Sequence, residues 1–179
     1  TDEAISALER IELLEGRTLQ TSLQKYALYL DKGERERAFE VLETMERESP
    51  YDLRIPTIRG RRYLESDDPE RALQCFESVA KSDPQNADLR LAMMEYYAQT
   101  GQMEKRTALR DSLLYGKETS DELRAQMAAM LIDDVKDDPD RHQRIMHALD
   151  TLIQLSPSAL MHTLKVSYLI AAKVEQDTI

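Results

Sequence analysis

Apolar residues recur along the chain at the three- and four-residue intervals of helices, with charged and polar residues between them. No stretch alternates apolar and polar residues for long enough to indicate a β-strand. Turn residues separate the segments at Gly33, Asp68-Pro69, Gly101 and Asp138-Pro139. The pattern therefore predicts an all-helical chain, with helices over residues 2–15, 19–31, 34–48, 52–66, 69–82, 87–100, 103–115, 120–136, 139–155 and 158–175.

Several residue types recur along the sequence at intervals of 34 residues. The columns that share this period are Ala4, Ala38 and Ala72; Leu8, Leu42 and Phe76; Ile11, Met45, Val79 and Leu113; Tyr29, Tyr63 and Tyr97; and Pro50 and Pro84. A fixed period carried by several independent columns indicates copies of one structural unit that stack on each other.

One stretch, residues 53–84, carries the full set of residue types that identifies this unit. It contains, in order, Gly60, Tyr63, Ala72, Phe76 and Pro84. Those residues resemble the glycine, tyrosine, alanine, aromatic and proline of the tetratricopeptide repeat, a 34-residue helix–turn–helix unit. The resemblance covers nearly all of the chain. It implies an all-α fold, a right-handed superhelical solenoid of about ten helices in antiparallel pairs.

The repeat register predicts one solenoid domain over residues 1–179. It divides that domain into a half unit at 1–17, complete units at 19–52, 53–86, 87–119 and 120–157, and a half unit at 158–179. We therefore expect a segment of a longer bacterial protein of this family. The register departs from the family pattern at Pro56, at Arg59, which replaces leucine, and at Arg106, which replaces alanine.

The two end helices carry more apolar surface than a capped solenoid needs. One apolar stripe is predicted along the first helix, made of Ile5, Leu8, Ile11 and Leu14. Apolar groups surround the last helix at Leu164, Val166, Leu169 and Ile170. Terminal repeats normally have a polar outer face. We expect docking on another chain, including self-association through the solenoid ends; a self-capping last helix is the alternative.

Net charge and cysteine content restrict the classes of partner. The formal charge of −10 argues against non-specific binding of nucleic acid and against docking on anionic membranes. No apolar stretch is long enough to span a bilayer, so direct membrane insertion is not expected. Cys75 is the single cysteine, which excludes an internal disulfide and leaves the compartment open between cytoplasm and bacterial envelope.

A cluster of arginines reverses the local charge in the second complete repeat. Arg54, Arg59, Arg61 and Arg62 lie in nine residues, with no acid between Leu53 and Leu64. Guanidinium groups suit carboxylates. The family register implies that Arg54 and Arg61 face the concave groove and that Arg62 reaches its rim, where they would anchor an acidic segment of a partner. The alternative is internal pairing with acids such as Glu36, Glu65, Asp88 or Glu95.

Apolar residues of the first helices are expected to form the floor of the same groove. They are Leu23, Ala27, Leu30 and Leu64. An apolar peptide segment could lie on such a floor. The alternative is that these residues make ordinary contacts between repeats.

The sequence offers no catalytic, metal or cofactor motif. His142, His147 and His162 lack the spacing of metal ligands, and the acidic run at 133–140 lacks the glycine and glutamate of a calcium loop. We therefore predict a non-enzymatic scaffold that binds a protein or peptide, without metal or cofactor. The alternatives are a structural, homo-oligomerising repeat segment and a regulatory arm of a larger protein.

Overall fold

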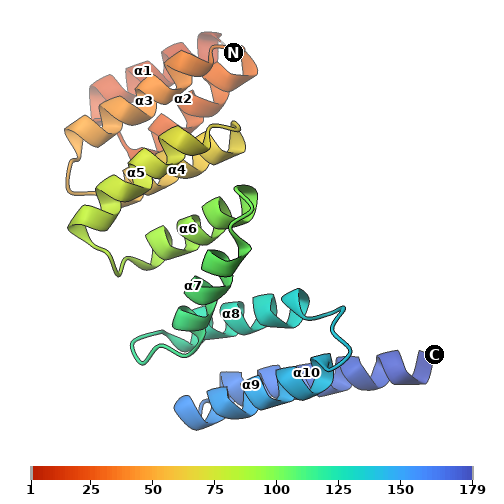
Figure 1. The fold of residues 1–179 in the computed structure, drawn as a ribbon. Coiled ribbons are helices and arrows are strands. Elements are labelled where there is room, and N and C mark those ends of the chain that lie inside the picture. Colours follow the sequence, from red (N-terminus) through yellow and green to blue (C-terminus); the bar gives the residue numbers. More distant parts are fainter. Residues whose placement is uncertain (1, 179) are drawn as a thin grey trace. The chain divides into compact units, whose positions relative to one another are not determined.

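The computed structural model describes the backbone of residues 2–178 and the side chains of residues 2–173. Within those bounds the chain forms ten α-helices and no strand (Figure 1), and the all-helical prediction is confirmed. The helices are α1 (Asp2–Glu15), α2 (Leu19–Asp31), α3 (Arg35–Glu48), α4 (Arg54–Glu65), α5 (Pro69–Ser82), α6 (Ala87–Gln99), α7 (Met103–Leu114), α8 (Asp121–Asp134), α9 (Arg141–Leu155) and α10 (Ala159–Thr178). They divide into an N-terminal body, Thr1–Gln102, and a C-terminal body, Met103–Ile179.

The N-terminal body contains two helical hairpins, α2/α3 and α4/α5, followed by α6 (Figure 1). Three turns that are 34 residues apart share a left-handed backbone conformation: φ is 76° at Gly33, 57° at Asp67 and 72° at Gly101. Glycine adopts this conformation without steric cost, and aspartate is one of the few other residues that tolerates it. The repeat period seen in the sequence is thus also a period of the backbone.

The repeat columns supply the core of the N-terminal body. Ala38 and Ala72 are fully buried, as are Leu42 and Phe76. Gly60 faces the Phe76 ring so closely that an added Cβ would lie 2.8 Å from Phe76 Cδ1. Small residues in α3, α4 and α5 therefore let the helices approach, and large residues of the same columns fill the space between them.

Gly60→Ala is expected to lower the free energy of unfolding by about 1–3 kcal/mol. Alanine favours a helix over glycine by about 1 kcal/mol, but the new methyl group would clash with a ring that has no room to move. Urea unfolding followed by circular dichroism measures the loss. In a Phe76→Leu background the same substitution should be neutral or stabilising; an equal loss there would show that the Phe76 ring is not the cause.

The first helix differs from its prediction, because its apolar residues lie on two faces. Ile5 is buried and packs with the α2/α3 hairpin. Ile11 and Leu14 are exposed, so the single stripe predicted from Ile5 to Leu14 is wrong. The face that contacts the hairpin continues instead with Glu12, whose side chain is only 8% exposed.

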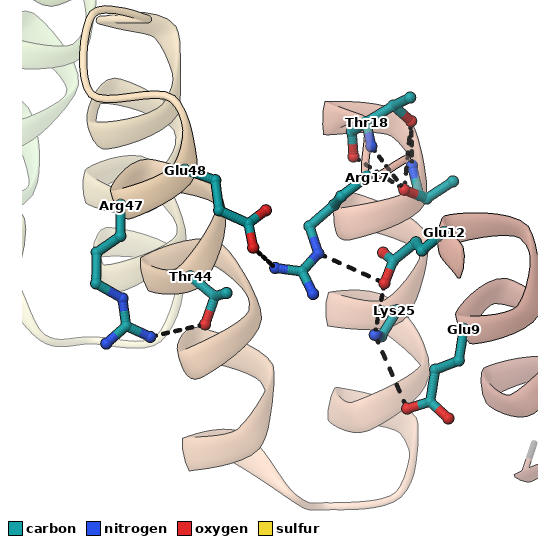
Figure 2. A network of polar contacts seen from close by, with 9 residues as sticks. Glu9, Glu12, Arg17, Thr18, Lys25, Thr44, Arg47 and Glu48 are labelled. Atoms are coloured by element: carbon teal, nitrogen blue, oxygen red, sulfur yellow. Dashed lines mark hydrogen bonds and ion pairs between the residues drawn. The ribbon is translucent and has the colours of Figure 1, made fainter. Parts of the chain in front are cut away.

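A polar network joins α1, α2 and the end of α3 (Figure 2). The ammonium group of Lys25, a buried residue, lies 3.1 Å from Glu12 Oε2 and 3.9 Å from Glu9 Oε1. Arg17 Nε lies 3.4 Å from the same Glu12 oxygen, and Arg17 Nη1 donates to Glu48 Oε1 at 2.8 Å. Two cations thus hold one buried carboxylate, and the network fastens three helices.

Acid is expected to weaken this network by protonating Glu12. Burial raises the pKa of the Glu12 carboxyl, but the hydrogen bond and charge of Lys25, with the charge of Arg17, outweigh burial and hold the pKa below its ordinary value. The carboxylate therefore stabilises the fold fully above the pKa of an unfolded glutamate, and this contribution is lost as the pH falls through the lower folded pKa.

Glu12→Gln provides the test. The difference in urea midpoint between wild type and variant should be constant from pH 6 to about pH 5 and should shrink below about pH 4. A difference that does not change with pH would contradict the role of the charge.

The C-terminal body contains α7 to α10 around a core of its own. Its buried apolar residues include Leu113, Leu114, Met127, Leu149, Leu152 and Met161. Asp134 of α8 pairs with two arginines of α7, with Arg106 Nη1 at 2.9 Å and with the buried Arg110. Arg106 stands where the repeat pattern has alanine, a small residue that lets helices approach closely. Here it makes an ion pair with Asp134 of α8 instead.

The predicted third repeat, 87–119, is divided between the two bodies, since α6 belongs to one and α7 to the other. Its pairing into one unit, like the other repeat boundaries, stays a prediction. The start of α9 is corrected: Asp138-Pro139 does not begin the helix, which starts at Arg141. Asp138 instead pairs with Arg144 and accepts a hydrogen bond from the Asp140 amide at 2.9 Å.

Candidate protein-binding surfaces

The arginine cluster lies on α4, and its first member is the most exposed. The Arg54 side chain is 68% exposed. Its Nε and Nη2 donate to the two carboxylate oxygens of Asp52 at 2.8 and 2.6 Å. This bidentate contact lowers the pKa of Asp52 and raises the pKa of Arg54. Arg54 is thus held by a neighbour in sequence and keeps one Nη group at the surface.

Arg61 links α4 to α6. Its Nε donates to Oε2 of Glu95 at 3.0 Å, and the two side chains are 31% and 54% exposed. Arg62 donates from Nη1 to both carboxylate oxygens of Glu65 at 2.7 Å and lies 5.8 Å from the ring centroid of Tyr26. Arg62 therefore connects α4 with α2 through an aromatic ring.

Arg59, the fourth arginine, faces the preceding hairpin. Its Nη1 lies 3.3 Å from Glu43 and its Nη2 lies 3.1 Å from Glu46, both on α3. Every arginine of the cluster thus has an acidic partner in this chain, as the alternative of internal pairing supposed. Glu65 and Glu95 are the two anticipated acids that take part.

The apolar residues expected in the groove differ in their exposure. On α2, Ala27 and Leu30 are exposed and Leu23 is partly buried. Leu64 is only 5% exposed and belongs to the core, and its carbonyl accepts a hydrogen bond from Gln99 Nε2 at 3.0 Å. The side chain of Leu64 is therefore not available to a partner, whereas Ala27 and Leu30 are.

A cleft of about 720 Å³ lies between α3 and α5, and the sequence did not reveal it. Two rings in this cleft, Phe39 and Tyr63, are stacked with centroids 4.0 Å apart and an interplanar angle of 3°. The guanidinium carbons of Arg35 and Arg71 lie 5.9 and 5.7 Å from these ring centroids. Its acidic lining residues are Glu36, Glu40, Glu43, Glu46 and Asp68.

Two of the acids in this cleft, Glu36 and Glu40, make no ion pair with any described residue. Cys75 also lines the cleft, but it is buried. Burial raises the pKa of the Cys75 thiol despite the nearby charge of Arg59, so the thiol is not activated. The sequence did contain a signal for this surface, since glutamates at 36, 40 and 43 share one face of α3.

Other kinds of site were sought over the same described residues. No three or more His, Cys, Asp or Glu side chains there come together in a way that could hold a metal ion. His142 Nδ1 lies 3.1 Å from the Tyr168 hydroxyl. In that part of the chain no helix combines the length and the apolar character needed to cross a membrane.

The family profile described as "Tetratricopeptide repeat" matches residues 63–105. A tetratricopeptide repeat protein from Parabacteroides merdae has a similar structure, with a TM-score of 0.54 and 19% sequence identity. The alignment covers 96% of this chain and 66% of that protein, so the chain spans less than two thirds of its length. The chain therefore has the fold of a tetratricopeptide-repeat solenoid, and residues 63–105 match the repeat itself.

MamA from AMB-1 is 17% identical to this chain, and the TM-score of the two structures is 0.49. The alignment covers 88% of this chain and 84% of MamA, and we base no conclusion about this chain on it. No curated protein matches the sequence. Tetratricopeptide repeats are generally non-catalytic scaffolds, which agrees with a role in protein–protein interaction.

Proposed function

We propose that this tetratricopeptide-repeat protein is a scaffold that binds an acidic segment of a protein partner on the surface of α2 and α4. The observation that supports the proposal is that Arg54 is exposed and Arg61 is partly exposed, and each is held by a carboxylate of the same chain. We call Arg54, Arg61 and Arg62, with Leu23, Ala27 and Leu30, the arginine surface. Leu64 supports this surface from the core.

Exchange of carboxylates is the mechanism that the geometry favours. Exposed ion pairs contribute only about 0–1 kcal/mol, so a partner carboxylate displaces Asp52 or Glu95 at little cost. Arg61 uses Nε alone for Glu95, which leaves its two Nη groups for a bidentate contact. The exposed Ala27 and Leu30 offer apolar area for side chains that flank the acids.

The experiment is a pull-down from lysate of the source cell with wild type and an Arg54→Glu, Arg61→Glu double variant. A partner that binds through its acids should be lost from the variant, because two attractive contacts become repulsive. The control is an Arg10→Glu, Arg47→Glu variant, which makes the same change of charge at two exposed arginines of α1 and α3. It should retain the partner. Equal capture by all three proteins would contradict the proposal.

The cleft between α3 and α5 is a second candidate surface, favoured by its volume of about 720 Å³ and its stacked rings. Its two unpaired glutamates suit a basic segment rather than an acidic one. A Glu36→Lys, Glu40→Lys variant in the same pull-down separates the two surfaces. A partner that the Glu36→Lys, Glu40→Lys variant loses and the Arg54→Glu, Arg61→Glu variant retains would bind in the cleft.

A further inference from the structure

The cleft between α3 and α5 is elongated and follows both helices. On α3 its lining extends from Arg35 to Glu46. On the other side it extends from Asp68, the N-cap of α5, to Ser78. With a rise of 1.5 Å per residue these stretches are about 16 and 15 Å long, or roughly three helical turns. The cleft therefore has the length of a peptide segment and not of a single ion, and it lies entirely within the N-terminal body.

The three arginines of this cleft already have carboxylate partners. Arg59 lies near two glutamates of α3, at 3.3 and 3.1 Å. Asp68 Oδ2 lies 3.9 Å from Arg35 Nη2 and 3.6 Å from Arg71 Nε. An acidic ligand in the cleft would therefore have to displace an internal carboxylate, whereas a basic ligand would not.

Two glutamates of the cleft have no ion-pair partner in the part of the chain that the structure describes. Glu36 and Glu40 are exposed on the α3 side of the cleft. They are four residues apart, so their carboxylates are neighbours on one face of the helix, where like charges repel each other. The whole lining carries five carboxylates against three arginines. Cations bound to Glu36 and Glu40 would relieve the repulsion without displacing an internal partner.

The cleft favours a helical segment over an extended one. Backbone amides and carbonyls within α3 and α5 are bonded inside their own helices, so the two sides of the cleft present no edge on which a strand could pair. The Ser78 hydroxyl, which lines the cleft, already donates to the Cys75 carbonyl at 2.7 Å. An extended segment would therefore bury peptide groups with few partners, whereas the peptide groups of a helix bond to each other.

We propose that the cleft between α3 and α5 binds a basic helix of another protein, in which two lysines or arginines four residues apart pair with Glu36 and Glu40. Helices that lie side by side have the same rise per residue, so this spacing matches that of the two glutamates. The aliphatic stems of the basic side chains lie along Phe39, which lines the cleft on the same face of α3. The arginine surface takes no part, so this proposal and the proposed binding of an acidic segment stand or fall separately.

Three labelled peptides, titrated with the 179-residue chain and followed by fluorescence anisotropy, test the proposal. The first is an alanine-rich helix of about 16 residues with two lysines four residues apart. The second has the same composition but places the lysines two residues apart, on different faces of the helix. The third has a central proline, which keeps the charge and breaks the helix. The first peptide should bind, and the other two should bind more weakly by about fivefold or more.

Two variants of the chain locate the site. Glu36→Gln, Glu40→Gln removes both charges at nearly constant side-chain size and should weaken binding of the first peptide by about tenfold. Glu70→Gln, Glu77→Gln is the matched control, since it removes the same charge at two exposed glutamates of α5 that do not line the cleft. This control should bind the first peptide like wild type, and unchanged circular dichroism establishes that both variants are folded.

The outcomes separate this proposal from the proposed function. The Arg54→Glu, Arg61→Glu variant should still bind the first peptide, because neither arginine lines the cleft. No binding of the first peptide by wild type up to about 1 mM would overturn the proposal. Equal binding of the three peptides, or equal effects of the two glutamine variants, would overturn it as well.

Discussion

Phe76→Ala is expected to lower the free energy of unfolding of the N-terminal body by about 3–5 kcal/mol. Phe76 is among the fully buried side chains, and its ring fills the space that Gly60 leaves open between α4 and α5. Removing the ring deletes apolar contacts and leaves a cavity that the rigid hairpin cannot close. Urea unfolding followed by circular dichroism measures the loss.

Leu13→Ala serves as its control, since the Leu13 side chain is exposed and its removal should change stability by less than about 0.5 kcal/mol. A loss below about 1 kcal/mol for Phe76→Ala would mean that Phe76 is not a core residue. The repeat register, which depends on that column, would then be wrong.

Arg124→Met is expected to lower the free energy of unfolding of the C-terminal body by about 2–4 kcal/mol. The buried Arg124 guanidinium donates to three carbonyls of the α7–α8 connection, Leu114 at 2.9 Å, Gly116 at 3.1 Å and Thr119 at 2.9 Å. Methionine fills similar volume but leaves these acceptors without a donor. The loss should appear as a lower urea midpoint and as faster hydrogen exchange in residues 114–124.

Arg141→Met provides the comparison for this prediction. Arg141 also donates to a carbonyl, that of Lys136 at 2.8 Å, but the contact is exposed and water can replace it. Its loss should cost less than about 0.5 kcal/mol. Similar costs at the two positions would contradict the structural role of Arg124.

The fold of the N-terminal body could be predicted because its local signals repeat. The alanine, glycine and aromatic columns fix how closely the helices approach, and the left-handed turns at Gly33, Asp67 and Gly101 recur at the same period. Pro56 is also compatible with the helical fold, because it lies in the first turn of α4, where the helix needs no backbone amide donor.

The C-terminal body was harder to predict because ion pairs replace the repeat columns there. Arg106 and Arg110 meet Asp134, and such pairs over more than twenty residues leave no periodic signal. Asp138-Pro139 repeats the start of α5 in sequence, yet Asp138 pairs with Arg144 and α9 begins later. The same Asp-Pro pair therefore begins a helix at one position of the chain and not at the other.

The candidate surfaces were predicted only in part, because exposure depends on neighbouring helices. The arginine cluster and the exposed Ala27 and Leu30 lie on the helices expected to carry them. Leu30 and Leu64 are equivalent in the repeat, but Leu64 is buried and Leu30 is not. The cleft between α3 and α5 depends on the separation of two helices, which a sequence pattern does not report.

Hydrogen–deuterium exchange on the purified complex tests the central claim most directly. The partner captured in the pull-down is eluted, purified and added back to the chain. Binding at the arginine surface should slow exchange in α2 and α4, at residues 19–31 and 54–65, and leave α9 unchanged. Protection confined to α9 and α10, or no protection in α4, would contradict the proposed function.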